Sequence, residues 1–205
     1  MPRLARILPL TLLLPLLALV LAGCQTTLNG SAQDQPTRPV GPVTSLAVDA
    51  ADQSLVEVAG GLWRSTDQGQ TWSALPIPAA LHPEKLRQVA TMASAPDSIY
   101  VAGPGAGVLR SDDGGKTWRR ISSGLPSQQV AAFAVHSNLP DTIYSWIADQ
   151  GVFRTENGGQ RWEKMDDGPS APVVAIAHST LAGSMNTGWL YVATPDGPYL
   201  SMDCF

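Results

Sequence analysis

Charged residues are scarce in this chain, and their scarcity limits the partners that it can bind. Only 15% of the 205 residues are charged, with 13 basic and 17 acidic side chains and a formal net charge of −4. No run of Lys and Arg forms the basic stripe that a nucleic-acid-binding domain presents, so no nucleic-acid partner is expected. P-loop and Ser-His-Asp patterns are missing, and the lone glycine loop at 103–107 is weak evidence for phosphate binding. We therefore expect no cofactor.

A long uninterrupted hydrophobic run is missing as well. Residues 7–20 are apolar but contain Pro9 and Pro15, and the run is too short for a transmembrane helix. Two arginines precede the run and small residues follow it, which is typical of a secretory signal peptide. We expect residues 1–23 to be this signal peptide. The polar residues 24–41 then form a flexible tether in front of the folded domain.

Cysteine is almost absent, since the chain has only Cys24 and Cys204. The segment Leu21-Ala22-Gly23-Cys24 resembles the bacterial lipobox, in which the cysteine is diacylated and becomes the first residue of the mature protein. The resemblance implies that acylated Cys24 anchors the protein to a lipid bilayer, because two or three acyl chains give stable attachment. Gln25 stands where an aspartate would signal retention in the inner membrane. The implied location is the bacterial cell envelope, on the periplasmic side of the outer membrane or on the cell surface if the source is Gram-negative.

An acidic, glycine-rich turn that ends in tryptophan recurs along the remainder of the chain. The central copy is Ser111-Asp112-Asp113-Gly114-Gly115-Lys116-Thr117-Trp118, and further copies occupy residues 65–72 and 155–162. A fourth copy begins at residue 201, so the starts at 65, 111, 155 and 201 are separated by 46, 44 and 46 residues. A constant step of this length indicates a repeat fold in which each unit buries its faces against its neighbours.

The residue types of this turn suit a β-hairpin loop. Asp113 can accept hydrogen bonds from backbone N–H groups of the loop, and Gly115 can adopt a positive φ. Ser111 and Thr117 can cross-link the loop through their hydroxyl groups. Trp118 then packs on the neighbouring repeat and buries roughly 150–250 Å². The expected unit is therefore a hairpin whose tryptophan fastens it to the adjacent unit.

The pattern S-x-D-x-G-x-T-W resembles the Asp-box, or BNR, repeat of sialidases, sortilin-type receptors and many bacterial β-propellers. In those families the Asp-box is structural and lies away from the active site. The third copy departs from the pattern at three positions, with Thr155, Asn157 and Arg161. The structural Asp-box residues that the resemblance implies are Ser65, Asp67, Gly69, Thr71, Trp72, Ser111, Asp113, Gly115, Thr117, Trp118, Thr155, Asn157, Gly159 and Trp162.

Alignment on these turns gives four short strand-like segments in each repeat, rich in tryptophan and β-branched residues. The first strands are expected at 43–48, 89–93, 130–135 and 173–177, the second at 55–58, 99–102, 143–147 and 190–193, and the third at 62–64, 108–110, 152–154 and 199–200. The fourth strands carry the tryptophan of each turn. Four antiparallel strands per repeat are typical of a propeller blade. Residues 42–205 are thus predicted to be an all-β propeller of three full blades and a fourth blade that lacks its last strand.

The unfinished fourth blade bears on the size of the ring. A propeller closes its ring to protect its strand edges. The blades form either a compact four-bladed ring or part of a larger ring of six to eight blades, and we favour the larger ring. Cys204 has no partner in the chain once Cys24 is acylated, and the last turn is incomplete, so we expect the natural chain to continue.

Ligands of such propellers usually meet the face formed by the loops between the fourth and first strands and between the second and third strands. Here these loops are 76–88, 122–129 and 166–172, together with 60–61, 103–107, 149–150 and 194–198. The longest loop carries His82, Glu84, Lys85 and Arg87. A loop of mixed charge is most often only a solvated face. The functional alternative is that these four residues bind a partner.

Two histidines end the first strands of successive repeats. His136 and His178 occupy corresponding positions and can approach each other, and two histidines can begin a metal site. The corresponding position of the second repeat is Ser94, so a third ligand is not evident. We therefore expect exposed loop histidines and no metal.

Catalytic residues are hard to find in the chain. The arginine-initiated signature of sialidases is missing, and Arg64, Arg110 and Arg154 recur in phase with the turns, which favours a structural role. Glycoside hydrolysis needs two carboxylates at a set separation, whereas the adjacent Asp166 and Asp167 would diverge. No catalytic residue is therefore assigned.

The chain is similar to the broad group of sialidase-like and photosystem II stability- and assembly-factor-like repeat proteins. This resemblance covers the repeats and implies a binding or scaffold module, with a protein partner, that serves the assembly or stability of a membrane protein complex. Two alternatives remain open: a truncated carbohydrate-active propeller, sialidase-like or another glycoside hydrolase, and a glycan-binding module without turnover.

Overall fold

The computed structural model describes residues 41–49, 52–181 and 188–202. The predicted signal peptide, almost all of the tether, Cys24 and Cys204 lie outside these ranges. Within them, no helix is long and apolar enough to cross a bilayer. The described residues form an all-β fold with two short 3-10 turns, η1 (Ala79–Leu81) and η2 (Pro83–Lys85).

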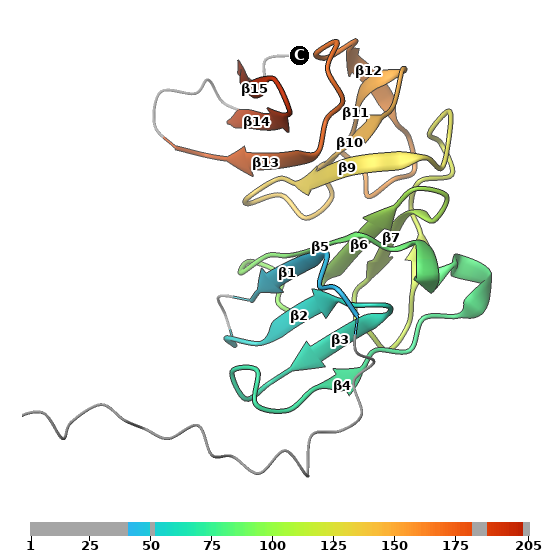
Figure 1. Ribbon diagram of the computed structural model, residues 1–205, viewed down its shortest axis with the longest axis vertical. Helices are drawn as coiled ribbons and strands as arrows, with labels where there is room; N and C mark the ends of the chain where they lie inside the picture. The colour runs from blue at the N-terminus through green and yellow to red at the C-terminus, as the bar shows by residue number, and fades with distance from the viewer. Residues whose placement is uncertain (1–40, 50–51, 182–187, 203–205) are drawn as a thin grey trace, which may run out of the picture. The chain divides into compact units, whose positions relative to one another are not determined.

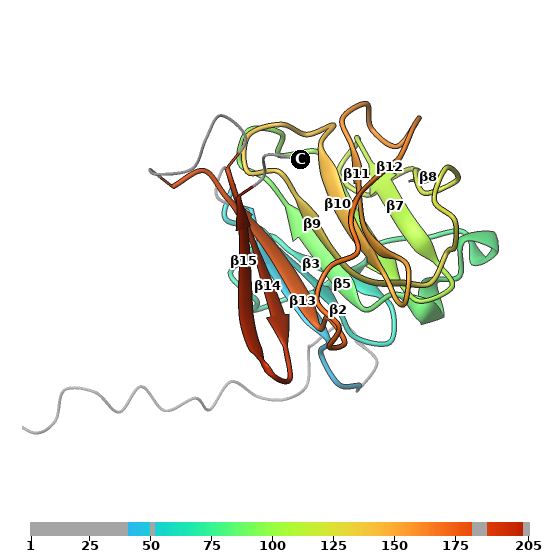
Figure 2. The same cartoon turned by 90° about the horizontal axis from the view of Figure 1, so that it is seen from above.

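The strands form four antiparallel sheets in chain order, and each sheet is one propeller blade (Figures 1 and 2). The first three sheets have four strands, and the fourth has three within the described residues. Their bounds are β1 (Ser45–Val48), β2 (Leu55–Val58), β3 (Leu62–Ser65) and β4 (Ser73–Ala74) in blade 1, β5 (Gln88–Thr91), β6 (Ile99–Gly103), β7 (Gly107–Ser111) and β8 (Arg119–Arg120) in blade 2, β9 (Val130–Val135), β10 (Ile143–Ile147), β11 (Gly151–Thr155) and β12 (Glu163–Asp166) in blade 3, and β13 (Ala175–Ser179), β14 (Trp189–Thr194) and β15 (Gly197–Met202) in blade 4. The predicted all-β propeller is confirmed.

Most predicted strands agree with the structure, and the differences have local causes. The predictions for β2, β9 and β10 have the observed bounds. The prediction for β13 was two residues too early, because its ladder with β14 begins at the pair Ala175 and Ala193. The fourth strands begin one residue after the tryptophan. The indoles of Trp72 and Trp118 donate back to glycine carbonyls of their own turns, at 3.0 and 3.1 Å, so each tryptophan belongs to the turn.

Each blade presents side chains on two faces because side chains alternate across a strand. We call the face that packs against the next blade in the chain the forward face, and the opposite one the rear face. The blade 1–2 core joins Val56 and Val58 to Val89, Ile99 and Val101; the blade 2–3 core joins Tyr100 and Ala102 to Phe133, Ile143 and Phe153; the blade 3–4 core joins Tyr144 and Trp146 to Leu190 and Val192. Packing between blades therefore repeats three times along the chain.

Candidate binding surface

The acidic turns are closed by hydrogen bonds around one carboxylate. In the first turn, Asp67 accepts from the Thr71 backbone N–H at 2.8 Å, from the Thr71 hydroxyl at 2.5 Å and from the Ser65 hydroxyl at 2.7 Å. The second turn has the same contacts around Asp113. These bonds favour the ionised carboxyl, and they lower the pKa of Asp67 and Asp113 to about 2, with the threonine hydroxyl as the largest cause. The carboxylates of Asp67 and Asp113 thus accept hydrogen bonds from residues of their own loops.

The third turn keeps the loop with different groups. The Asn157 side-chain oxygen accepts from the Thr155 hydroxyl at 2.9 Å and from the Arg161 backbone N–H at 2.9 Å. The Trp162 indole crosses to the previous blade and donates to the Ile121 carbonyl at 2.8 Å. The three turns thus serve loop geometry and the contact between blades. They lie at the opposite strand ends from the loops where a ligand is expected.

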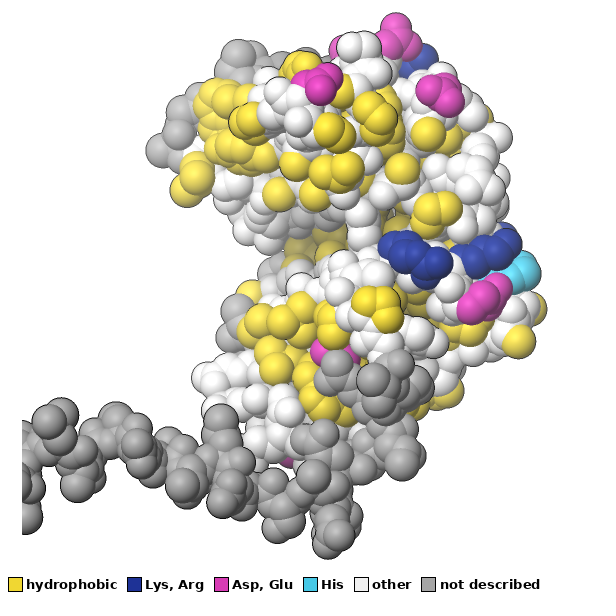
Figure 3. Space-filling model, viewed as in Figure 1, with side chains coloured by type: hydrophobic (Ala, Val, Ile, Leu, Met, Phe, Trp, Pro, Cys, Tyr) yellow, Lys and Arg dark blue, Asp and Glu magenta, His cyan; other side chains and the backbone are white. Residues whose placement is uncertain are grey.

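The loop between β4 and β5 holds the four residues that the sequence marks as a partner-binding candidate. His82 adopts a φ of 58° between the two 3-10 turns, and its Nδ1 lies 3.3 Å from the Glu84 carboxylate. The Arg87 guanidinium donates to the Glu84 and Leu86 carbonyls, at 2.9 and 2.6 Å. The Lys85 side chain lies against Gly105 of the neighbouring β6–β7 loop. Figure 3 shows basic, acidic and histidine side chains side by side on the part of the surface where this loop lies.

A pocket of about 650 Å³ lies on the same side of the blades, between the β10–β11 and β12–β13 loops. Its apolar lining includes Trp146, Pro172 and Val173. Trp146 occupies the position that Ala102 has in blade 2, and its ring is covered by the backbone at Gly168. A Cβ at Gly168 would lie 2.1 Å from the Trp146 ring, so only glycine permits this close approach. Trp146 is therefore only 5% exposed and contributes to the pocket lining at a register where the other blades have smaller residues.

The rim of this pocket is acidic. Asp149 lines it with a φ of 60°, a conformation that aspartate tolerates better than most residues. Asp167 lies on the other loop, and its carboxylate pairs with the Lys164 ammonium at 2.5 Å. The hydrogen bond from Lys164 lowers the pKa of Asp167, so this carboxyl stays ionised near neutral pH. The neighbouring Asp166 accepts from the Gly168 N–H at 2.5 Å.

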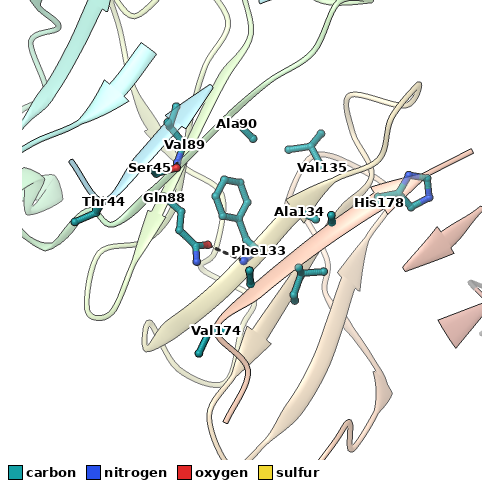
Figure 4. Close-up of a pocket in the computed structure, with 13 residues that line it drawn as sticks. Thr44, Ser45, Gln88, Val89, Ala90, Phe133, Ala134, Val135, Val174 and His178 are labelled. Carbon is teal, nitrogen blue, oxygen red and sulfur yellow. Dashed lines mark hydrogen bonds between the residues drawn. The ribbon is translucent and has the colours of Figure 1, made fainter. Parts of the chain in front are cut away.

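A second cavity, of about 360 Å³, lies where the innermost strands of all four blades converge (Figure 4). Side chains bond across the blades along its wall. The Gln88 amide accepts from the Phe133 N–H at 3.0 Å and donates to the Ala131 carbonyl at 3.2 Å, and the Ser45 hydroxyl accepts from the Val89 N–H at 3.1 Å. The wall has no Asp, Glu, Lys or Arg among its lining residues. It is a seam between blades, and its neutral lining gives it little to offer a charged ligand.

The two strand-end histidines do meet, but as packing groups. Their ring centroids are 4.0 Å apart, and the His178 ring stacks on Tyr144 at 5.5 Å. The expectation of exposed histidines was wrong for His136, which is only 5% exposed, because blade 4 packs over it. Its Nδ1 accepts from two backbone N–H groups, of Asn138 and Leu139, both at 3.1 Å. Among the described residues, no group of three His, Cys, Asp or Glu is placed to hold a metal.

The repeat-phased arginines lie within and between blades. The Arg110 guanidinium lies over the Tyr100 ring, 5.2 Å from its centroid, and bonds Asp141 of blade 3 at 2.6 Å. Arg64 and Arg154 pair with acidic residues of their own blades, at 2.9 and 3.2 Å. None of these arginines lines the described pockets on the loop side.

The sequence singles out the loop of His82 to Arg87 as a candidate, whereas the pocket beside Trp146 was not predicted from it. A signal for it exists in the repeat alignment. A tryptophan stands at a register position where the other blades have Val58, Ala102 and Ala193, and a glycine follows the next acidic pair. A large ring at a position that is otherwise small has to be accommodated by a neighbouring loop.

The family model of the photosynthesis system II assembly factor YCF48 matches residues 44–202. No curated protein matches the chain. A solved structure of YCF48 from Cyanidioschyzon merolae has a TM-score of 0.62 and 19% identity over 83% of this chain and 56% of that chain. A structure of YCF48 bound to D1 peptide has a TM-score of 0.54 and 16% identity over 78% of this chain and 49% of that chain.

Carbohydrate-active enzymes share the fold as well. The GH74 enzyme of Niastella koreensis has a TM-score of 0.58 and 20% identity over 76% of this chain, but only 26% of that chain. At such identities the likeness to solved structures shows the fold alone. This chain spans between a quarter and somewhat more than half of these three structures. The family model covers most of the chain, and the chain therefore belongs to the family of the photosynthesis system II assembly factor YCF48.

Proposed function

We propose that this protein is a binding module that holds a segment of a partner protein on its loop face and thereby serves the assembly or stability of a membrane protein complex. Membership of the YCF48 family supports a binding or assembly role. The solved YCF48 with a D1 peptide is a peptide complex of that protein, and it supports a polypeptide as the partner here.

The observation that carries the proposal is the pocket over Trp146. Its lining is largely apolar, with Ala148, Pro172 and Val173 beside the mostly buried Trp146, and its rim carries Asp149 and Asp167. Such a pocket suits an apolar side chain flanked by a basic one, because the apolar group leaves water and the base meets an acidic rim. Lys85 and Arg87, on the loop between blades 1 and 2, offer the opposite charge to another part of an extended segment. The loop face thus has charges of both signs for fixing the direction of a bound chain.

The test is co-purification from detergent-solubilised membranes, with the bound proteins identified by mass spectrometry. One variant carries Asp149→Asn with Asp167→Lys, where asparagine tolerates the positive φ of position 149. A second, Ser170→Trp, fills the pocket from an exposed position in its lining. Glu156→Lys is the control, since it reverses an exposed charge in the third acidic turn, away from the pocket.

We expect the unmodified protein and Glu156→Lys to recover the same membrane protein, and both pocket variants to lose at least about tenfold of it, as for removal of a hot spot of about 1.4 kcal/mol. Equal recovery by all four proteins would contradict the assignment of the pocket. Recovery of no membrane protein complex by the unmodified protein would contradict the assembly role itself.

We also propose that the module is held at the membrane by acyl chains on Cys24, in the bacterial cell envelope. The lipobox-like segment before Cys24 supports this. Labelled palmitate should enter the protein and be lost in Cys24→Ser, and that variant should appear in the soluble fraction. A mature chain with an unmodified Cys24 would exclude the anchor without affecting the pocket.

A further inference from the structure

The joint between blades 3 and 4 contains two of the three histidines of the chain. His136 extends the β9–β10 ladder by one residue, since its N–H donates to the Thr142 carbonyl at 2.9 Å, and it lies on the forward face of blade 3. His178 lies on β13, on the rear face of blade 4 (Figure 4). The two rings are 4.0 Å apart between centroids, and that of His178 also stacks on Tyr144. The histidines therefore form this joint at the strand ends opposite to the pocket over Trp146.

The preceding joint, between blades 2 and 3, has apolar residues at the same places. The ladders put Met92 where blade 3 has His136, and Val135 where blade 4 has His178. The two histidines are thus one register position apart, and not equivalent as the sequence suggested. Met92 and Val135 pack in one core with Tyr100. The joint between blades 3 and 4 therefore has two ionisable rings where the joint before it has an apolar contact.

Both histidine rings are held through Nδ1, which acts as an acceptor. The Nδ1 of His136 accepts from the backbone N–H groups of Asn138 and Leu139, both at 3.1 Å. The Nδ1 of His178 accepts from the Ser137 N–H at 3.0 Å. A ring nitrogen that accepts from an N–H group carries no proton, so each neutral ring has its proton on Nε2. A second proton would have to enter at Nδ1, where it would break these hydrogen bonds.

The surroundings of the two rings do not offset a second proton. Tyr144, the phenol in contact with the His178 ring, is uncharged at and below neutral pH. Residues 137–140 and 179–190, which flank the histidines in the chain, include no Asp, Glu, Lys or Arg. The charged side chains of the adjacent loop and strand are held in ion pairs, which are Arg110–Asp141 and Arg154–Glu156. Two charged rings 4.0 Å apart would also repel each other. The closed joint therefore favours neutral histidines.

The same joint forms part of the wall of the pocket. Trp146 and Val173 line the pocket, and they share one core with Leu190 and Val192 of blade 4. The pocket residues 167–173 also lead directly into β13. A separation of blade 4 from blade 3 would therefore displace one wall of the pocket.

We propose that His136 and His178 form a histidine latch, which holds blade 4 on blade 3 near neutral pH and loosens in acid. Histidine is the side chain whose charge ordinarily changes between about pH 5 and 8. The open joint binds more protons than the closed one, so a fall in pH through this range favours the open joint. The latch thereby weakens binding in the pocket at low pH. This last step rests on the proposed function, whereas the latch itself does not.

The test of the latch is hydrogen exchange of the full chain at about pH 7.5 and about pH 5.5, measured by mass spectrometry. The results are compared as protection factors, because the chemical rate of exchange itself depends on pH. We expect the protection of β13 to fall at the lower pH, by up to about tenfold for each histidine that takes up a proton per pH unit. The protection of β6 and β7 in blade 2 should stay unchanged. Equal protection of β13 at the two pH values would overturn the latch.

Two variants separate the latch from other effects of acid. His136→Met combined with His178→Val introduces the residues of the preceding joint, and its β13 should be equally protected at both pH values. His82→Asn is the matched control, since it removes the third histidine, which lies outside the joint, and asparagine tolerates the φ of 58° at this position. This control should keep the response of the unmodified chain. A response that persists in the double variant would assign it to other groups and overturn the latch.

Co-purification from detergent-solubilised membranes at the same two pH values tests the regulation of the pocket. The unmodified chain should recover less of its partner at the lower pH, whereas the double variant should recover equal amounts. Equal recovery by the unmodified chain would overturn the regulatory step. If no partner is recovered at either pH, the proposed function fails, and hydrogen exchange still decides whether the latch exists.

Discussion

One glycine recurs in the three acidic turns with the same backbone conformation and different neighbours, which makes it a graded test of how the blades are joined. The φ angles are 87° at Gly69, 91° at Gly115 and 88° at Gly159. Replacement by alanine forces a side chain into the left-handed region at each position, at roughly 1–2 kcal/mol of folding free energy. Any difference among the three variants must then come from what the new methyl group meets.

The neighbours range from a side chain in ordinary contact to the backbone of the preceding blade. At Gly69 the nearest atom to an added Cβ would be a methyl group of Leu55 at 3.4 Å, which is ordinary contact. At Gly115 it would be the end of the Leu75 side chain at 2.9 Å, which can move to another rotamer for about 0.5–1.5 kcal/mol. At Gly159 it would be the Ile121 carbonyl oxygen at 2.0 Å. A backbone oxygen cannot rotate away.

The Ile121 carbonyl has a second role, which raises the cost of moving it. It accepts the hydrogen bond of the buried Trp162 indole, and the loss of that bond would leave two buried polar groups without partners, at about 1–3 kcal/mol. Overpacking adds about 1–3 kcal/mol. We therefore expect Gly69→Ala to cost about 1–2 kcal/mol, Gly115→Ala about 1.5–3.5 kcal/mol, and Gly159→Ala about 3–8 kcal/mol, a large part of a typical total stability of about 5–15 kcal/mol.

The assay is urea denaturation of the three variants and the unmodified chain, monitored by far-ultraviolet circular dichroism. A thermal scan gives a second measurement, in which each kcal/mol of lost stability should lower the melting temperature by about 2–4 °C at this chain length. Equal losses at the three positions would refute the reasoning, because they would mean that only the backbone conformation matters. If Gly159→Ala lost no more stability than Gly69→Ala, the Ile121 backbone of blade 2 could move away from the added methyl group without a loss of folding free energy.

Three other outcomes follow from single contacts. Tyr100→Phe should lose about 0.5–1.5 kcal/mol in urea denaturation, because it removes the hydrogen bond from the buried hydroxyl to the Pro140 carbonyl across blades at 2.6 Å, while the Arg110 guanidinium still donates to that carbonyl at 3.2 Å. The carboxyls of Asp67 and Asp113 have a folded pKa of about 2 against a usual value of 3.8, so the stability that they contribute is present above about pH 4 and is lost as the pH falls towards 2. The melting temperature measured over this pH range should fall accordingly, and the fall should be smaller in a variant with asparagine at both positions. Gln88→Ala removes two bonds to blade 3, so hydrogen exchange should accelerate in β9 while that in β12 stays unchanged.

The blades could be predicted from the sequence because their signals are local. Strand β9 is a run of six apolar residues between loops, and the hairpins on either side of each turn are fixed by residues within about ten positions. The turn pattern itself gives the repeat length. Register follows, since a slip of one residue would exchange the two faces of a strand.

The parts that the sequence did not reveal depend on contacts between residues far apart in the chain. His136 looks like a loop residue in the sequence, but it becomes buried because blade 4 brings His178 over it. The pocket over Trp146 needs Gly168 from another loop, and periodicity says nothing of that approach. The arrangement of the blades in space decides which exposed loop residues line a pocket and which face only solvent.

The third acidic turn shows how such a repeat can drift without loss of its fold. In the first two turns, one carboxylate oxygen bonds the hydroxyl of Thr71 or Thr117, and the other holds the rest of the loop. In the third turn Arg161 has no hydroxyl, so a second carboxylate oxygen at position 157 would have no such donor. Asn157 has a single side-chain oxygen, and this oxygen accepts the two remaining hydrogen bonds, from the Thr155 hydroxyl and the Arg161 backbone N–H. The two substitutions are therefore coupled through one hydrogen bond. At position 157 the third turn therefore has no carboxylate that can be protonated by acid. Its Trp162 indole donates to the preceding blade, whereas the indoles of Trp72 and Trp118 donate to carbonyls of their own turns.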